Sequence, residues 1–443
     1  MFSHRVRRGM YAALLGALVS SAASGSDSSL LLSLNEAERL ALENNPRMKI
    51  AADSLVTARA KVTGSRATLL PSVSGTAGYT RNVDRNAFYF GGTKMETGAV
   101  NDYTLAVTGT QPLFLGFAGI TSLRMSELGV KTAELQYRET QQDVVDQVRQ
   151  AYLAAVLNRS LVEVSREALA QADSTLAQVQ RRYDVGAASK FELIRAKVEV
   201  ATLRPNVISA ESNRELADAN LRMMIGLDSD VHVEPTDELE RFVSPWADMP
   251  YDSLLGIAYA QRTDIQQLRN VERTAQYGVR LARSSYYPQI AAFGRSSWQQ
   301  IGPETWDRAV AVGIQLNWNL WDSFGRRSQV QQARVGVRQV GSIQRLTEQG
   351  IGLQVESAQK TLHEASVSLQ SLQETVELAN ESLRLARVLY SAGGSTQLDI
   401  MNAQLALTQA RTQYATALYR YHIAHSQMER ALGRIAPTNN PSD

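Results

Sequence analysis

The sequence predicts a mainly α-helical protein with a small β part, in which long helical hairpins occur twice along the chain. Three observations support this fold class: an internal repeat, long segments with an apolar period of seven, and short segments with a period of two. The repeat is clearest at YDVGAASKFELIRAK (183–197), which returns 207 positions later as YSAGGSTQLDIMNAQ (390–404). Self-similarity of this kind indicates that each half of the chain repeats one plan.

The repeat extends beyond this motif and defines the expected division of the chain. Upstream the offset is 217 rather than 207, since Pro71 then matches Pro288. The ten-residue difference must lie in 72–112 of the first half and 289–319 of the second. We expect a first repeat over 24–225, an inter-repeat linker over 226–250, a second repeat over 251–434 and a C-terminal tail over 435–443.

The first 23 residues predict a secretory signal peptide. They combine a basic start with the apolar run MYAALLGALV (10–19) and the small residues SSAASG (20–25), which place cleavage after Ala23 or Gly25. A membrane anchor is the alternative, but a bilayer-spanning helix needs about twenty apolar residues. We therefore expect an exported chain.

Charge and cysteine content exclude several classes of protein. The net charge of +2 includes three arginines of the leader, so the exported chain is close to −1 and has no basic run for nucleic acid. The absence of cysteine excludes disulfides, thiolate metal sites and N-terminal lipidation through a cysteine. Packing alone must hold the fold.

The helical prediction rests on a long segment without helix breakers. Neither glycine nor proline occurs from Val130 to Val185, and apolar residues recur every seven positions in both halves. A helix from about 121 to 182 would be on the order of 90 Å long. In the second half the seam consists of Val355, Leu362, Leu369, Val376, Leu383 and Tyr390 before the tip, and Ile400, Leu407, Tyr414, Tyr421 and Met428 after it.

The repeated motif itself predicts the turn of each hairpin. Gly186 and Gly393 can adopt the left-handed conformation that ends a helix. Ser189 and Thr396 can cap the helix that follows. Each half is therefore expected to contain two long antiparallel helices joined at a short tip.

At the other end of each hairpin the apolar period becomes two. The segments 102–111 and 308–318 read as strands, and 72–80 and 289–298 as their partners. A small sheet packed on the helices is one reading of this alternation. In the other reading one face contacts lipid, and Thr104, Ala106 and Thr108 face a lumen. The lipid-facing candidates are Tyr103, Leu105, Val107, Val310, Val312 and Ile314.

Four strands per chain cannot close a barrel, because the smallest membrane barrels have about eight. Eight strands enclose little more than their own side chains, so an open duct needs more. Three chains with four strands each give twelve strands and would place the long helices around a hollow cylinder.

The chain resembles the outer membrane efflux protein (TolC-like) family over almost its whole exported length. The resemblance implies a homotrimer with a 12-stranded transmembrane β-barrel in the cell outer membrane and a long helical tunnel in the periplasm. It also implies docking to a periplasmic adaptor and an inner-membrane pump of RND or ABC type, with the linker around the tunnel's equator. The matching segments are 32–79, QPLFLGFAG (111–119), RRYDVGAASKFELIRAKVEVA (181–201), LNWNLWDSFGRR (316–327) and LYSAGGSTQLDIMNAQLAL (389–407).

The same resemblance assigns roles at the tips. Asp399 would line the periplasmic constriction, and Tyr390 would hold the closed tip through a bond to the neighbouring hairpin, where Glu192 is the matching acid. The chain departs from the family at Asn402, where a second acid is usual, and at Ser395, where a basic residue is usual. The alternative is that both acids are solvated first-turn residues that stabilise a helix N-terminus.

No catalytic constellation is recognisable, so we expect no enzyme and no cofactor. The chain has no cysteine nucleophile, no P-loop and no nucleotide-binding glycine pattern. His422, His425 and Glu429 have a spacing that could chelate a metal, but a partly exposed helix face is the favoured interpretation. At the start of the chain, Ser33 and Glu36 predict a capping box.

Two functions remain at this point. The first is an export duct that conducts solutes from an inner-membrane pump, as part of a tripartite efflux or type I secretion system. The second is an exported structural or adhesive coiled coil without a channel. The strand segments favour the duct, because a rod has no reason to duplicate them in phase.

Overall fold

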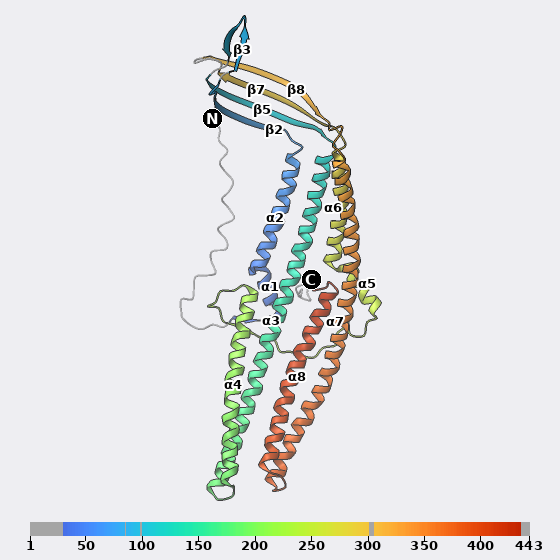
Figure 1. Cartoon of the computed structure of the whole chain (residues 1–443). Helices are drawn as coiled ribbons and strands as arrows, with labels where there is room; N and C mark the ends of the chain where they lie inside the picture. Colours follow the sequence, from blue (N-terminus) through green and yellow to red (C-terminus); the bar gives the residue numbers. More distant parts are fainter. Residues whose placement is uncertain (1–29, 85, 98–99, 301–304, 436–443) are drawn as a thin grey trace, which may run out of the picture.

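The computed structural model describes residues 30–84, 86–97, 100–300 and 305–435, and the expected signal peptide lies outside them (Figure 1). A four-stranded sheet lies at one end, and long helices run from it to two separate tips (Figure 1). The first half contains β1 (Leu30–Leu32), α1 (Leu34–Asn44), α2 (Pro46–Ala67), β2 (Ser72–Arg81), β3 (Asn86–Phe90), β4 (Thr93–Thr97), β5 (Asn101–Leu115), α3 (Ala118–Asp184) and α4 (Lys190–Ile225). The second half contains β6 (Val233–Pro235), α5 (Tyr251–Gln261), α6 (Thr263–Ser284), β7 (Gln289–Gln300), β8 (Trp306–Asn317), α7 (Gly325–Ser391) and α8 (Gln397–Ala431).

The internal repeat is confirmed element by element. Helices α3 and α7 each have 67 residues, begin 207 positions apart and end 207 positions apart. At about 1.5 Å per residue each is roughly 100 Å long, slightly more than the sequence predicted. Helices α1 and α2 match α5 and α6 at the offset of 217. The offset changes because the first half contains an additional hairpin, β3–β4, which the sequence analysis did not predict.

The helices form a single curved wall rather than a compact bundle. In the half nearest the sheet, α2 packs on α3, α3 on α6 and α6 on α7. In the half nearest the tips, α4 packs on α3, α3 on α8 and α8 on α7 (Figure 1). Only α3 and α7 run the full length. At mid-height α6 is followed by α8 between them, and α2 is followed by α4 on the other side of α3. We call this level the equator.

Two buried clusters stabilise the equator. In the first half, Val144, Val148 and Tyr152 of α3 pack against α1 and the end of α4. In the second half, Ile351, Val355 and Leu362 of α7 pack against α5 and α8. Eight of the eleven seam residues predicted in the second half are therefore buried, and Val376, Tyr390 and Tyr414 are half-buried, because one apolar side of α7 faces α8 along the hairpin.

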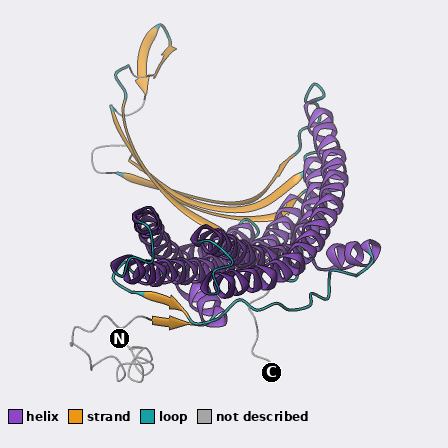
Figure 2. Cartoon of the chain, turned by 90° about the horizontal axis from the view of Figure 1, so that it is seen from below, coloured by secondary structure: helices purple, strands orange, loops and turns teal. Residues whose placement is uncertain are grey.

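The strands β2, β5, β7 and β8 form one antiparallel sheet in that order. The four predicted strands are confirmed. Strand β5 joins the two repeats by pairing with β7, and the outer strands β2 and β8 each leave one edge unpaired within the described chain. Figure 2 shows the sheet as a strongly curved arc, with the short parallel pair β1–β6 on the side of the helices away from the hollow of the arc.

Candidate functional site

The two tips have nearly identical backbones. Gly186 and Gly393 adopt left-handed φ values of 77° and 79°, as the sequence predicted. In each tip the following residue donates its N–H to a carbonyl of the preceding helix: Ala187 to Arg182 at 2.7 Å, and Gly394 to Leu389 at 2.8 Å. This pairing satisfies the last carbonyls of α3 and α7, so each helix can end in a tight turn.

The two acids of the tips occupy equivalent positions in capping boxes. Glu192 Oε2 accepts the Ser189 N–H at 2.8 Å, and Asp399 Oδ2 accepts the Thr396 N–H at 2.7 Å. The hydroxyls of Ser189 and Thr396 in return accept the N–H groups of these acids. Hydrogen bonds from the backbone and side chain of Thr396 hold the pKa of Asp399 below its ordinary value. The hydrogen bonds therefore fix the direction of both carboxylates, of which Asp399 is exposed and Glu192 is half-buried.

Asn402 lies one helical turn after Asp399 and is exposed like it, so the two side chains share one face of α8. Ser395 donates its hydroxyl to the carbonyl of Ala386 at 3.2 Å within its own hairpin. Because position 402 is an asparagine, Asp399 is the one exposed carboxylate in this part of α8. Because position 395 is a serine, its side chain bonds within its own hairpin.

Tyr390 contacts the other hairpin of the same chain rather than Glu192. The guanidinium of Arg182, on α3, lies 5.0 Å from the centre of the Tyr390 ring. A cavity of about 680 Å³ extends from this contact between α3 and the second hairpin, and Gln397 and Ile400 line it. A contact between Tyr390 and Glu192 would need a second copy of the chain, since α4 and α7 lie at opposite ends of the wall described above.

Sequence reasoning missed three residues of this interface. Gln397 and Gln404 are buried on α8, and their side-chain amides have no hydrogen-bond partner within the described residues. Arg411 follows seven positions later and forms an ion pair with Glu167 of α3. The available signal was the spacing of seven between these three polar residues, because a helix that packs against two neighbours has a second seam.

The sheet separates two faces as the alternation predicted. The register aligns Val107 with Ser296 and Ser296 with Val310, so all six lipid-facing candidates lie on one face. Their side chains are exposed, from 42% for Tyr103 to 82% for Val312. Thr104 and Thr108 point to the opposite face, as does Ala106, which is buried among its neighbours.

At the equator a buried charge network joins the two repeats. Arg149 of α3 donates to Glu38 of α1 at 2.9 Å and to Glu429 of α8 at 2.7 Å. Burial alone would lower the pKa of Arg149, but the two carboxylates raise it above its ordinary value. Burial would likewise raise the pKa of Glu429, but His425 and Arg149 hold it below its ordinary value. We call Glu38, Arg149, His425 and Glu429 the equatorial network.

The inter-repeat linker clamps the same helix. His425 shares a hydrogen bond of 2.9 Å with Ser244, and His422 one of 2.9 Å with the carbonyl of Glu240. The ring of Phe242 packs between both histidines. His422 and His425 are thus occupied by the linker, and the described residues contain no group of three or more His, Asp or Glu side chains placed to hold a metal ion.

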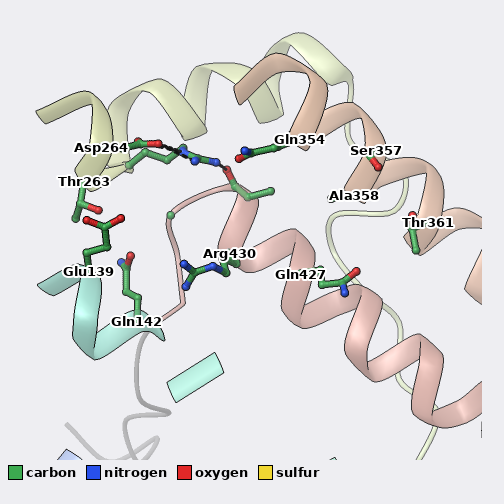
Figure 3. A pocket seen from close by; sticks show the side chains of 13 residues that line it. Glu139, Gln142, Thr263, Asp264, Gln354, Ser357, Ala358, Thr361, Gln427 and Arg430 are labelled. Atoms are coloured by element: carbon green, nitrogen blue, oxygen red, sulfur yellow. Dashed lines mark hydrogen bonds and ion pairs between the residues drawn. The ribbon is translucent and has the colours of Figure 1, made fainter. Parts of the chain in front are cut away.

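A polar cavity of about 430 Å³ lies where α6 begins and α8 ends (Figure 3). Arg262 donates to Asp264 at 2.7 Å and to the carbonyl of Ala431 at 3.1 Å, which ties the two helices together. Figure 3 shows Glu139 and Gln142 of α3 on the opposite wall. Glu139 accepts a hydrogen bond of 2.7 Å from Gln267 of α6. These groups connect helices, which is a structural role.

None of the described helices combines the length and the apolar character that crossing a membrane would require.

Comparison with known proteins agrees with this architecture. The sequence pattern of the family described as "Outer membrane efflux protein" matches residues 38–227 and 254–434. The chain is 23% identical to outer membrane protein TolC of Vibrio cholerae over 429 residues, 94% of each chain. It is 22% identical to the alkaline protease secretion protein AprF of Pseudomonas aeruginosa, covering 90% of this chain and 83% of that protein.

The fold is also that of a solved channel. The crystal structure of the CmeC outer membrane channel of Campylobacter jejuni superposes with a TM-score of 0.77 at 18% identity, covering 92% of this chain and 87% of CmeC. The family match spans both repeats and leaves out mainly the leader and the linker. The chain therefore belongs to the outer membrane efflux protein family.

Proposed function

We propose that three copies of this chain form an outer-membrane exit duct of a tripartite efflux or type I secretion system. The observation that carries the proposal is the four-stranded sheet, which has one apolar exposed face and two unpaired edges, β2 and β8. Unpaired edges in a bilayer are costly, because lipid cannot satisfy backbone hydrogen bonds. Pairing β8 of one copy with β2 of the next closes twelve strands around an open lumen.

The same association would close the helical wall. Helices α2 and α4 stand at one side of the wall and α7 at the other, and both sides expose apolar residues. Burial of these side chains between copies would stabilise the trimer at about 25 cal/mol per Å² of apolar surface. The apolar residues are Ile194, Val198, Ile208 and Leu216 on α4, and Leu346, Leu353, Leu378 and Leu385 on α7.

Family membership and the names of relatives support a proposal for the partners. We propose that a periplasmic adaptor and an inner-membrane pump dock at the tips, and that the pump selects the cargo. One relative is named a probable efflux pump outer membrane protein, TtgC of Pseudomonas putida, and AprF is named an alkaline protease secretion protein, so the names of relatives support both kinds of export. We propose the same division of the chain as above: a signal peptide over 1–23, two repeats, a linker over 226–250 and a tail over 435–443.

We further propose that the tips form the gate. Three copies of Asp399 would gather around the threefold axis, one helical turn closer to the tip than Asn402, where like charges repel one another and favour cations. Tyr390 would reach Glu192 of an adjacent copy when the duct is closed. Gly186 and Gly393 would supply the tight turns that bring both hairpins to the axis.

Single-channel conductance of the trimer in planar bilayers tests this function. Asp399→Asn keeps a capping oxygen but removes the charge, so we expect cation selectivity to fall with little change in fold. Tyr390→Phe combined with Glu192→Ala should raise conductance by weakening the closed state. Asp173→Ala, an exposed acid on α3 away from the tips, is the matched control and should change neither quantity.

Two outcomes would contradict the proposal at different levels. A monomer that ignores detergent and forms no conducting unit would favour the structural coiled coil over the duct. A conducting trimer in which none of these variants changes selectivity or conductance would retain the duct and exclude the gate residues.

A further inference from the structure

Four arginines gather where α6 and α7 meet the sheet. Arg283 lies in the last turn of α6, and Arg327, Arg334 and Arg338 follow one another along a single face of α7. With Tyr286 and Tyr287 they line a cavity of about 710 Å³. We call these six residues the arginine pocket.

The arginines of the pocket are not neutralised within the described chain. None of the four guanidinium groups forms an ion pair or a hydrogen bond with a described residue. Arg326, one residue away, is in contrast bonded to Asp322 at 3.0 Å and to the carbonyl of Asn319 at 2.6 Å. Four unpaired cations around one cavity repel each other, so an anion that enters it would be bound favourably.

The corresponding groove of the first repeat is different. At the two repeat offsets, Glu127 takes the place of Arg334, and Arg66 that of Arg283. Arg66 and Glu127 form an ion pair at 4.0 Å. The first repeat therefore pairs one of the cations in its groove, whereas none of the four arginines of the second is paired with a described residue.

The arginine pocket lies on the outer, apolar side of the wall. Phe114 pairs with Ile290, and Ile290 pairs with Leu316. Because Leu316 lies on the same face of β8 as Ile314, Phe114 lies on the apolar face of the sheet. The ring of Phe117 lies 5.2 Å from that of Phe114 and 5.4 Å from that of Tyr287. Tyr287 thus connects the apolar face of the sheet with the cavity just below it.

We propose that the arginine pocket binds the phosphate headgroup of an anionic phospholipid in the periplasmic leaflet of the outer membrane. This inference rests on the proposed placement of the sheet in that membrane, which puts the first turns of α7 at headgroup depth. Guanidinium groups bind phosphate through paired N–H donors, and tyrosine rings are favoured at the membrane interface. The tyrosines are half exposed and would lie along the start of the acyl chains.

Lipid binding to the purified trimer, measured by native mass spectrometry, tests the proposal. Phosphatidylglycerol is the anionic probe, and phosphatidylethanolamine, which has the same phosphate but no net charge, is the reference lipid. Arg334→Gln with Arg338→Gln should weaken phosphatidylglycerol binding roughly 25-fold, at about 1 kcal/mol or fivefold per arginine. Arg124→Gln with Lys131→Gln removes two charges from the corresponding groove of the first repeat and should leave binding unchanged.

The outcomes separate this proposal from the function itself. A chain that forms no trimer in detergent would overturn the barrel and the lipid site together. A conducting trimer that prefers phosphatidylglycerol equally in both double variants would overturn the lipid site alone. Soluble glycerol phosphate that displaces the lipid fully at equal concentration would also overturn it, because the pocket would then be a site for free anions.

Discussion

At the equator the stabilising contacts join residues far apart in sequence, whereas at the tips the hydrogen bonds join residues at most nine positions apart. Arg149 reaches Glu38 across 111 positions and Glu429 across 280. The equator therefore binds the two repeats to each other. The tips carry their own caps and depend on little else.

The difference indicates which part of the molecule can move. A hairpin whose turn and caps are local keeps its structure when it shifts relative to its neighbour, because no internal hydrogen bond of the tip is lost. Near the tips, two polar contacts join the hairpins within the described chain: the guanidinium of Arg182 lies against the ring of Tyr390, and Arg411 pairs with Glu167 farther from the tips. We infer that a change at the equator affects global stability, and that a change at a tip affects local opening.

The largest effect is expected for Arg149→Met. This substitution leaves Glu38 and Glu429 in a buried site without their cation, which should reduce the free energy of unfolding by about 3 to 5 kcal/mol. Thermal unfolding of the trimer would measure it. Arg39→Met, which removes the exposed partner of Glu43 in α1, is the control and should change stability by at most about 0.5 kcal/mol.

The triple variant Glu38→Gln, Arg149→Met and Glu429→Gln sharpens this test. If the unpaired charges cause the loss, removing all three should recover most of the stability. If the triple variant is as unstable as Arg149→Met alone, packing of the arginine side chain matters more than its charge.

A smaller effect of opposite sign is expected at Asp218, where α4 meets β6. Burial raises the pKa of Asp218 to about 6. Arg214, 3.5 Å away, acts in the opposite direction, but the carboxylate of Glu234, which pairs with the same arginine at 3.0 Å, also raises the pKa. The folded pKa exceeds the unfolded one, so the protonated form stabilises the fold below pH 4 and this stability is lost as the pH rises through about 6.

Asp218→Asn should therefore raise stability at pH 8 by roughly 1 to 3 kcal/mol, and have little effect at pH 4. Chemical unfolding of parent and variant at both pH values would measure the difference. The exposed Asp230→Asn in the linker is the control. An equal gain at pH 4 and pH 8 would mean that the asparagine stabilises by packing and that titration of Asp218 is irrelevant.

Much of the fold could be predicted because its signals are local and duplicated. The left-handed Gly186 and Gly393, the caps at Ser189 and Thr396, and the four strands follow from short-range patterns that occur twice. The hairpin β3–β4 could not be found by the repeat, because it has no counterpart in the second half. The pair β1–β6 was also missed, since each strand has three residues and its partner lies about two hundred positions away.

The candidate site was predicted less completely for a related reason. The capping positions of Glu192 and Asp399 are visible as motifs, so the sequence could predict that these acids stabilise a helix N-terminus. The partners of Arg149 depend on how α1 and α8 are brought against α3, and no local pattern contains that information. The contact of Arg182 with Tyr390 is likewise a consequence of the arrangement of the two hairpins.

The smallest effect is expected for the caps of the tips. It tests directly whether the tips are stabilised independently of the equator. Thr396→Ala removes the hydroxyl that accepts the Asp399 N–H, and Ser189→Ala does the same at the first tip. Loss of an N-cap costs about 1 kcal/mol, so amide hydrogen exchange in the first turn of α8 or α4 should become about fivefold faster. Exchange of the α3 amides around Val148 should not change, because the equatorial network does not depend on the tips.

Arg149→Met should produce the reverse pattern, with faster exchange at the equator of both repeats and little change at residues 396–401. If a cap variant accelerated exchange at the equator as strongly as at its own tip, the hairpins would unfold as one cooperative unit with the wall, and tip movement without unfolding would be excluded.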